Sequence, residues 1–181
     1  LVDLVDAVGR VKDPGPAFDA FARAVLGGWA SQGAKKQLQA DLQLWYLRED
    51  TLRQRAYGTP DMWGLGRLDA VSMIFNRLTG LDLGPAPSYL IPGNIQPADA
   101  PTRYPFLWNA AIQDLTQWPG FSGNGTSVTG LARNTGEVIG VFATFHPQVD
   151  IFKIGNIDFK TINSADGFGL LAVENLIKKI G

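Results

Sequence analysis

Apolar residues recur at helical spacing through the first 80 residues of the chain. This spacing predicts a short helix from Leu1 to about Val8 and, after a Pro-Gly-Pro break at 14–16, a second helix reaching Trp29. A third, heavily charged helix is predicted from Leu38 to about 57, and a fourth from about 68 to Gly80. The region 1–80 should therefore be helical throughout.

Prolines then interrupt the chain at positions 85, 87, 92, 97, 101 and 105. Proline stops helix propagation and removes a donor from a central strand, so region 81–107 is predicted to be a long ordered loop. Loops of this length are uncommon in compact domains unless they cover a surface or line a site. We expect this one to wrap around a cofactor.

The last part of the chain, 108–181, returns to helical spacing after a glycine- and serine-rich loop at 121–130. Apolar positions three and four residues apart predict a fifth helix from Val128 to Phe142. Ser164 is predicted to cap a final helix that runs to Ile177, and 146–161 is too irregular for a confident strand. The expected fold is one mainly α domain with long Pro/Gly-rich loops and little or no β structure.

Composition narrows the possible functions. The chain has 181 residues, 45% of them hydrophobic, and a net charge of -1 with dispersed basic residues, which predicts neither nucleic-acid nor anionic-membrane binding. No apolar run approaches the roughly 20 residues of a membrane span. The chain has no cysteine and only one histidine, His146, so we predict no metal site and no covalent haem attachment within it.

General motifs of catalysis are mostly missing. The Gly64-Leu-Gly66 sequence lacks the third glycine of a dinucleotide fingerprint, and Asp69 and Glu137 are too far apart in sequence to suggest a glycosidase pair. His146 is more typical of a structural residue than of a ligand. Five tryptophans remain, and an indole beside a redox cofactor can pass an electron.

The tryptophans divide into two groups by their surroundings in the sequence. Trp29 and Trp45 follow helical spacing and are predicted to lie in the core. Trp63, Trp108 and Trp118 stand in loop-rich sequence, where functional residues concentrate. By residue type alone, packing explains these three better than function does.

The segment PFLWNAAIQDLTQWPG at 105–120 resembles the tryptophan-bearing segment of bacterial di-haem c-type cytochrome peroxidases, and the sequence from Asn134 to Glu137 is similar to an Asn-x-x-Glu element that follows it there. Wider similarity, around 64–70, 98–108 and 131–142, is to a branch that includes rubber oxygenase-like proteins. In that branch these elements lie between the two Cys-x-x-Cys-His motifs. The resemblance implies an inter-haem region cut from a larger protein.

The resemblance also implies roles for individual residues. Trp118 would stand between two haem c groups as an electron relay, and Glu137 would be the acid/base on the distal side of the peroxide-reacting haem. Trp108, Gln117 and Arg133 would lie beside the cofactor, with Arg133 stabilising developing charge. The haems would be carried by the remainder of a periplasmic or secreted protein, served by an electron-donor protein.

Departures from the peroxidase pattern favour the broader branch. Arg103 replaces a calcium-binding asparagine, so calcium is not expected, and no histidine precedes His146 to act as a removable distal ligand. Pro119 and Phe121 replace the acid and the base that follow the tryptophan in peroxidases. A different hypothesis stays open, in which this is a cofactor-free helical binding module that uses exposed aromatics such as Trp63 and Trp108. In that case Glu137 would lie on an outer helix face and Trp118 would only pin its loop to the core.

Overall fold

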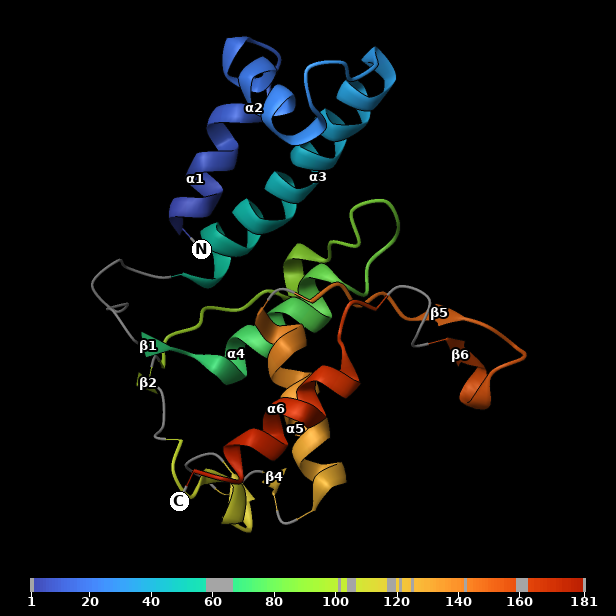
Figure 1. Cartoon of the computed structure of the whole chain (residues 1–181). Coiled ribbons are helices and arrows are strands. Elements are labelled where there is room, and N and C mark those ends of the chain that lie inside the picture. Colours follow the sequence, from blue (N-terminus) through green and yellow to red (C-terminus); the bar gives the residue numbers. More distant parts are fainter. Residues whose placement is uncertain are drawn as a thin grey trace.

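A computed structural model describes residues 2–57, 67–100, 102–103, 107–116, 120, 122–124, 126–141, 143–158 and 163–180. The protein is mainly helical, as predicted. Figure 1 shows an arm of helices α1 (Val2–Val11), α2 (Pro16–Leu26) and α3 (Gln32–Ala56) above a body that contains α4 (Ala70–Phe75), α5 (Ser127–Val141) and α6 (Gly167–Ile177). No described helix has the length and apolar character that a membrane span requires.

The arm contains the three helices that the sequence predicts, although α3 begins at Gln32, six residues before the predicted Leu38. Ser31 caps α3 by accepting a hydrogen bond from the amide of Ala34 at 3.1 Å. The prediction for Trp29 was wrong: α2 ends at Leu26, Gly27 takes a left-handed φ of 83°, and Trp29 is fully exposed. Trp45 of α3 is half-buried.

Helix α4 continues directly into η2 (Asn76–Leu81), a π-helical segment that packs on α3. Asp69 caps α4 by accepting from the amide of Ser72 at 3.0 Å, and its second oxygen accepts from the amide of Ala100 at 3.1 Å. This buried carboxylate is therefore used structurally. The core of the junction contains apolar residues from α3, α4, η2 and the loop that follows: Leu52, Ala56, Met73, Leu81, Ile95 and Ala98.

The described part of the proline-rich segment has little regular structure beyond η3 (Pro92–Asn94) and packs on the protein's own core. The side chain of Asn76 donates to the carbonyl of Gln96 at 2.8 Å and accepts from the amide of Gln96 at 2.9 Å. The amide of Ala98 donates to the carbonyl of Ala56 at 2.7 Å. These bonds hold the segment against α3 and η2.

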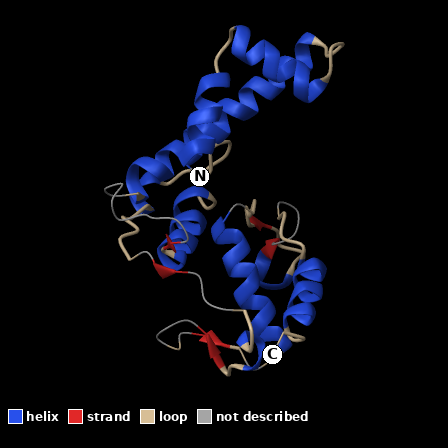
Figure 2. Cartoon of the chain, turned by 60° about the vertical axis from the view of Figure 1, so that its left-hand side comes forward, coloured by secondary structure: helices blue, strands red, loops and turns tan. Residues whose placement is uncertain are grey.

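Strands in the described residues are limited to three antiparallel two-stranded sheets, in agreement with the expected scarcity of β structure (Figure 2). Residues Arg67–Leu68 (β1) pair with Thr102–Arg103 (β2), Leu115–Thr116 (β3) with Ser122–Gly123 (β4), and Gln148–Val149 (β5) with Ile157–Asp158 (β6). Short 3-10 helices occur at Ala110–Ile112 (η4) and Ile154–Asn156 (η5).

Helix α6 begins at Gly167, and its N-cap lies two residues after the predicted cap, Ser164. The carboxylate of Asp166 accepts from the amides of Phe168 and Gly169, so Asp166 is the N-cap in place of Ser164. The Ser164 hydroxyl instead accepts from the amide of Thr144 at 2.8 Å. A carboxylate also complements the partial positive charge of the helix N-terminus, which favours this arrangement.

Candidate functional site

Helices α5 and α6 pack together through a buried polar contact. Arg133 of α5 lies 3.1 Å from Glu174 of α6, measured from Nη2 to Oε2, and Glu174 is 4% exposed. The amide of the Asn134 side chain donates to the same Glu174 oxygen at 2.8 Å, and its own oxygen accepts from Arg133. Charged groups are rarely buried without such partners.

Asn124 extends this contact to the loop before α5. Its side-chain oxygen accepts from Arg133 Nη1, and its side-chain nitrogen donates to the carbonyls of Ala110 and Gln113, each at 2.9 Å. Asn124 is itself buried. A single guanidinium group thus fixes the positions of α6 and of the chain around η4 relative to α5.

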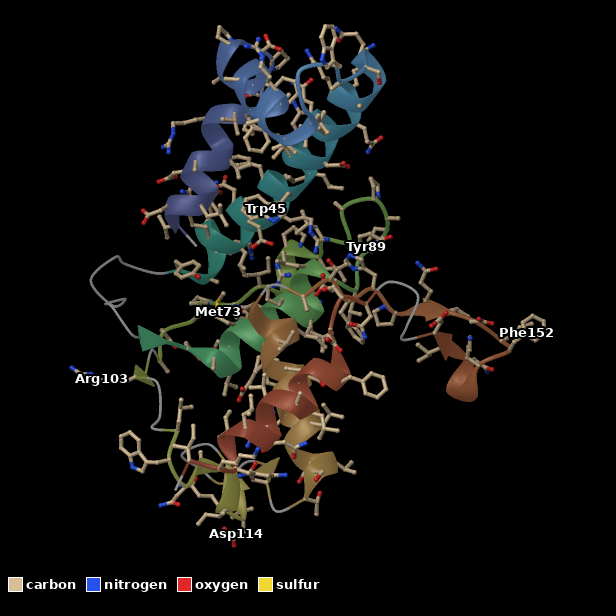
Figure 3. The ribbon with its side chains drawn as sticks, viewed as in Figure 1. Trp45, Met73, Tyr89, Arg103, Asp114 and Phe152 are labelled. Atoms are coloured by element: carbon tan, nitrogen blue, oxygen red, sulfur yellow. The ribbon has the colours of Figure 1, made fainter. Side chains whose placement is uncertain are left out.

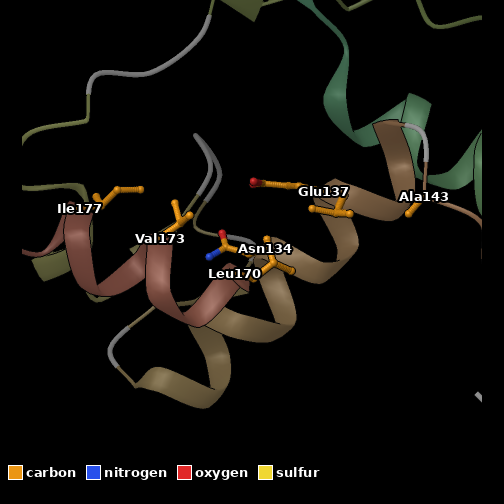
Figure 4. Close-up of a pocket in the computed structure, with 7 residues that line it drawn as sticks. Asn134, Glu137, Ala143, Leu170, Val173 and Ile177 are labelled. Carbon is orange, nitrogen blue, oxygen red and sulfur yellow. The ribbon is translucent and has the colours of Figure 1, made fainter. Parts of the chain in front are cut away.

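A shallow groove of about 440 Å³ runs along this helix pair. Its lining is mostly apolar and comes from both helices and from one residue that follows α5. The lining residues are Asn134, Glu137, Val138, Ala143, Leu170, Val173 and Ile177. Figure 4 shows Glu137 extending from α5 beside the side chains of α6. Glu137 is the sole ionisable group that lines the groove among the described residues.

The environment of Glu137 shifts its acidity although the residue stays exposed to solvent. Surrounding protein atoms desolvate the carboxylate and raise its pKa, and the negative charge of Glu174 acts in the same direction. The guanidinium of Arg133 opposes both effects. A carboxyl group with a raised pKa in a groove is suited to giving and accepting protons, although structural ion pairs also produce such shifts.

The remaining predicted site residues do not all meet here. Trp108 lies in the turn before η4, is 61% exposed and does not line the groove. Gln117 and Trp118 lie outside the described residues, as does Trp63. Arg103 pairs with Arg67 in the β1–β2 sheet. Of the predicted residues, the structure therefore brings together Arg133 and Glu137.

Two residues of this site were missed by the sequence analysis. Asn124 is one of several polar residues in a loop, and nothing in the loop sequence distinguishes it. Glu174 carried a usable signal, because it is the one charged residue in the mostly apolar sequence LLAVENLI. A single charge on an apolar helix is typical of a buried ion pair, but its partner lies 41 residues away and cannot be read from spacing.

Metal binding finds no support in the described part of the chain, where no three histidine, cysteine, aspartate or glutamate side chains gather. His146 lies away from the groove, with its ring stacked on Tyr89. The lining of the groove is apolar apart from Asn134 and Glu137. No residue lining the groove is a histidine, cysteine or methionine, so an iron ligand would have to come from elsewhere.

Comparison with known proteins gives a relative without a stated activity. The chain is 34% identical over 130 residues to the uncharacterized protein y4iJ of Sinorhizobium fredii (strain NBRC 101917 / NGR234). The match covers 70% of this chain and 20% of that protein, so the chain spans about a fifth of the relative's length. No family model and no solved structure matches the chain.

Proposed function

We propose that this chain is the inter-haem region of a di-haem c-type cytochrome oxidoreductase and that the α5–α6 groove forms part of the distal pocket of one haem. One observation carries the proposal. Glu137, the residue that the family resemblance assigns to acid/base catalysis, lies on an apolar groove and has a raised pKa. A desolvated carboxyl group on an apolar groove is the environment expected of an acid/base residue.

The residues of the groove fit one face of a haem but do not supply its attachment. Val138, Leu170, Val173 and Ile177 offer an apolar surface to a porphyrin ring. The absence of cysteine in the sequence means that both haem c groups must be bound by the remainder of the protein. When bound, the haem iron would supply the redox chemistry on peroxide or dioxygen.

The protein's own contribution is proton transfer and orientation. Ionised Glu137 would take the proton from the inner oxygen of hydrogen peroxide and return it to the outer oxygen, which then leaves as water. Arg133 acts as a positioning residue, because its guanidinium lowers the pKa of Glu137 and is fixed by Glu174 and Asn124. Its charge would also favour the negative charge that develops as the oxygen–oxygen bond breaks.

Electron transfer is assigned to the tryptophans in this proposal. Trp118 would relay electrons between the haems, with Gln117 and Trp108 beside the cofactor. An electron-donor protein would reduce the second haem, and c-type attachment implies a periplasmic or secreted protein. These roles rest on the sequence resemblance at 105–120.

The test is a comparison of Glu137→Gln with the wild type in the complete gene product, produced together with cytochrome c maturation. We expect the optical spectrum to show two haems in both proteins, and peroxide turnover to fall roughly 100-fold or more in the variant. The amide keeps the size of the carboxyl group but cannot accept the proton. Unchanged turnover with intact spectra would remove Glu137 from the mechanism.

Exposed aromatic residues support a second candidate function, a cofactor-free module that binds a partner through them. Trp108 is 61% exposed, and Phe152 at the tip of the β5–β6 hairpin is 90% exposed (Figure 3). The coding DNA on both sides of this segment separates the two candidates. The haem proposal requires Cys-x-x-Cys-His motifs there, and their absence would leave the binding module.

A further inference from the structure

Helix α6 lies on the outside of the body, where it packs against α5 and, at its C-terminal end, against η4 (Figure 1). Its polar and apolar residues are arranged in the opposite way from those of an ordinary surface helix. Glu174, the one charged residue between Gly167 and Ile177, is buried against α5. Phe168 and Leu176 are 89% and 61% exposed. A helix that is apolar on its outer face as well is typical of a helix covered on both sides.

The exposed apolar residues form one stripe along α6. Phe168, Ala172 and Leu176 follow each other at intervals of four residues and are all exposed, so they lie on the same side of the helix. Ile180, which is also exposed, extends this apolar surface beyond the end of the helix. Contiguous exposed apolar surface of this kind marks a site of interaction with another protein surface.

This stripe is separate from the groove of Glu137. The groove is lined on α6 by Leu170, Val173 and Ile177, which Figure 4 shows on the side of the helix that faces Glu137. At 3.6 residues per turn, the centre of this set is rotated by about 130° from the centre of the stripe. A partner on the stripe therefore leaves the groove accessible.

The charges at the two ends of α6 have opposite signs. Asp166 is exposed at the N-terminal end, and Lys178 and Lys179 are exposed at the C-terminal end. Asp166 caps its own helix through Oδ1 in both described bonds, so Oδ2 is left to accept from a lysine. Such a distribution of charge is complementary to a copy of the same helix in antiparallel orientation. The helix dipoles favour this orientation too, because each N-terminus then lies beside a C-terminus.

One register satisfies the apolar stripe and the charges together. When two antiparallel copies of α6 cross at Ala172, Phe168 of each copy lies opposite Leu176 of the other, because both are four residues from the crossing point. Asp166 of each copy then lies opposite Lys178 of the other, since both are six residues from it. The small side chain of Ala172 lets the two helices approach closely where they cross.

We propose that two copies of this protein associate through an antiparallel pair of α6 helices, with the two-fold axis at Ala172. A self-complementary contact of this kind closes at two copies, because each copy uses the same surface. The contact consists mainly of one short helix face, so the dimer belongs to the class of small, weak interfaces. We expect dissociation in the micromolar range of protein concentration.

Sedimentation velocity of the complete gene product over a range of concentrations tests the dimer. Leu176→Glu places a charge opposite Phe168 of the other copy and should weaken association at least tenfold. Phe152→Glu is the matched control, because Phe152 is an exposed apolar residue on the β5–β6 hairpin, and this variant should dimerise like the wild type (Figure 3). A wild type that stays monomeric overturns the proposal, as does a Leu176→Glu protein that dimerises equally well.

Disulfide cross-linking tests the antiparallel register, and it decides alone if circular dichroism shows that Leu176→Glu is unfolded. The chain contains no cysteine, so a cross-link absent from the wild type comes from the introduced residue. Ala172→Cys should form a disulfide-linked dimer, because the two copies meet there. Phe168→Cys should cross-link only when mixed with Leu176→Cys, because its own two copies lie about 12 Å apart along the helix axis, too far for a disulfide.

Two results of the cross-linking would overturn the proposal. Efficient cross-linking of Phe168→Cys with itself would show a parallel pair of helices. A monomeric Ala172→Cys protein under oxidising conditions would show that the second copy does not cover α6 at this point.

Discussion

Arg133 and Glu174 join helices α5 and α6 by an ion pair of 3.1 Å between Nη2 and Oε2. Replacing Glu174 by alanine should lower the free energy of unfolding by about 3 kcal/mol, because it leaves a largely buried guanidinium without its counter-charge. The side chain of Asn134 would lose its acceptor as well. Urea denaturation followed by circular dichroism measures the change.

Asp114→Ala is the matched control, since Asp114 is an exposed carboxylate of the same region and should change stability by less than about 0.5 kcal/mol. If Glu174→Ala were no more destabilising than this control, the ion pair would not be what holds α6 to α5.

Two glycines in helical segments should respond to alanine with opposite signs. At Gly80 an added Cβ would come within 2.4 Å of Cγ1 of the buried Ile95, so Gly80→Ala should destabilise the protein by about 1–3 kcal/mol through overpacking. At Gly136, inside α5, the added Cβ meets no atom within 4 Å. Gly136→Ala should therefore stabilise by roughly 0.5–1 kcal/mol.

Thermal or urea unfolding of both variants decides whether the contact between η2 and the proline-rich segment is as close as the structure has it. A stabilising effect of Gly80→Ala would show that the two segments are further apart.

The helices of this fold follow from local sequence, whereas the contacts between them do not. Apolar spacing located α1, α2, α3 and α5, because each of these helices packs one apolar face against the rest of the protein. Trp29 was misplaced because helical spacing continued in sequence beyond Gly27, where the backbone leaves the helix. Ser164 and Asp166 are both good caps, and only the structure shows which amides lie within reach of which side chain.

The candidate site shows the same division between local and distant information. Family resemblance supplied Glu137 and Arg133, but the partners that fix Arg133 come from a loop and from a helix far along the chain. The buried ion pair of Glu49 and Arg77 is similar, since the two residues are 28 positions apart and neither stood out in the sequence. Pairing at such distances depends on how the helices pack, which one sequence does not specify.

His146 should make stability depend on pH between about 5 and 7.5. Burial lowers its pKa in the folded protein, and the charges of Arg48 and Arg77 act in the same direction, while Asp82 opposes them. In the unfolded chain the pKa of His146 is near 6.5, so the unfolded state binds more protons than the folded state around this pH. Stability is therefore lost as the pH falls through this value. We expect the free energy of unfolding of the wild type, minus that of His146→Phe, to rise with pH.

The phenylalanine ring keeps the stacking on Tyr89 and removes the titration, which makes this variant the appropriate reference. Urea denaturation at several pH values measures the difference. Parallel stability curves for the two proteins would show that His146 does not titrate differently in the folded state.

Glu137 should set the acid limb of peroxide turnover if it is the proton acceptor of the proposed haem pocket. Only its ionised form can take a proton, so turnover should fall as the pH drops through its pKa. Because desolvation and Glu174 raise that pKa, the midpoint should lie above the usual glutamate value of about 4.3.

Arg133 provides the control for this assignment, because its charge holds the pKa of Glu137 down. In Arg133→Gln the acid limb should move to higher pH while remaining present, whereas in Glu137→Gln the remaining turnover should lose it altogether. Rates measured between pH 4 and 8 on proteins with intact haem spectra distinguish these results. An acid limb that persists unshifted in both variants would belong to a different group, and the proton acceptor would then have to be sought outside α5.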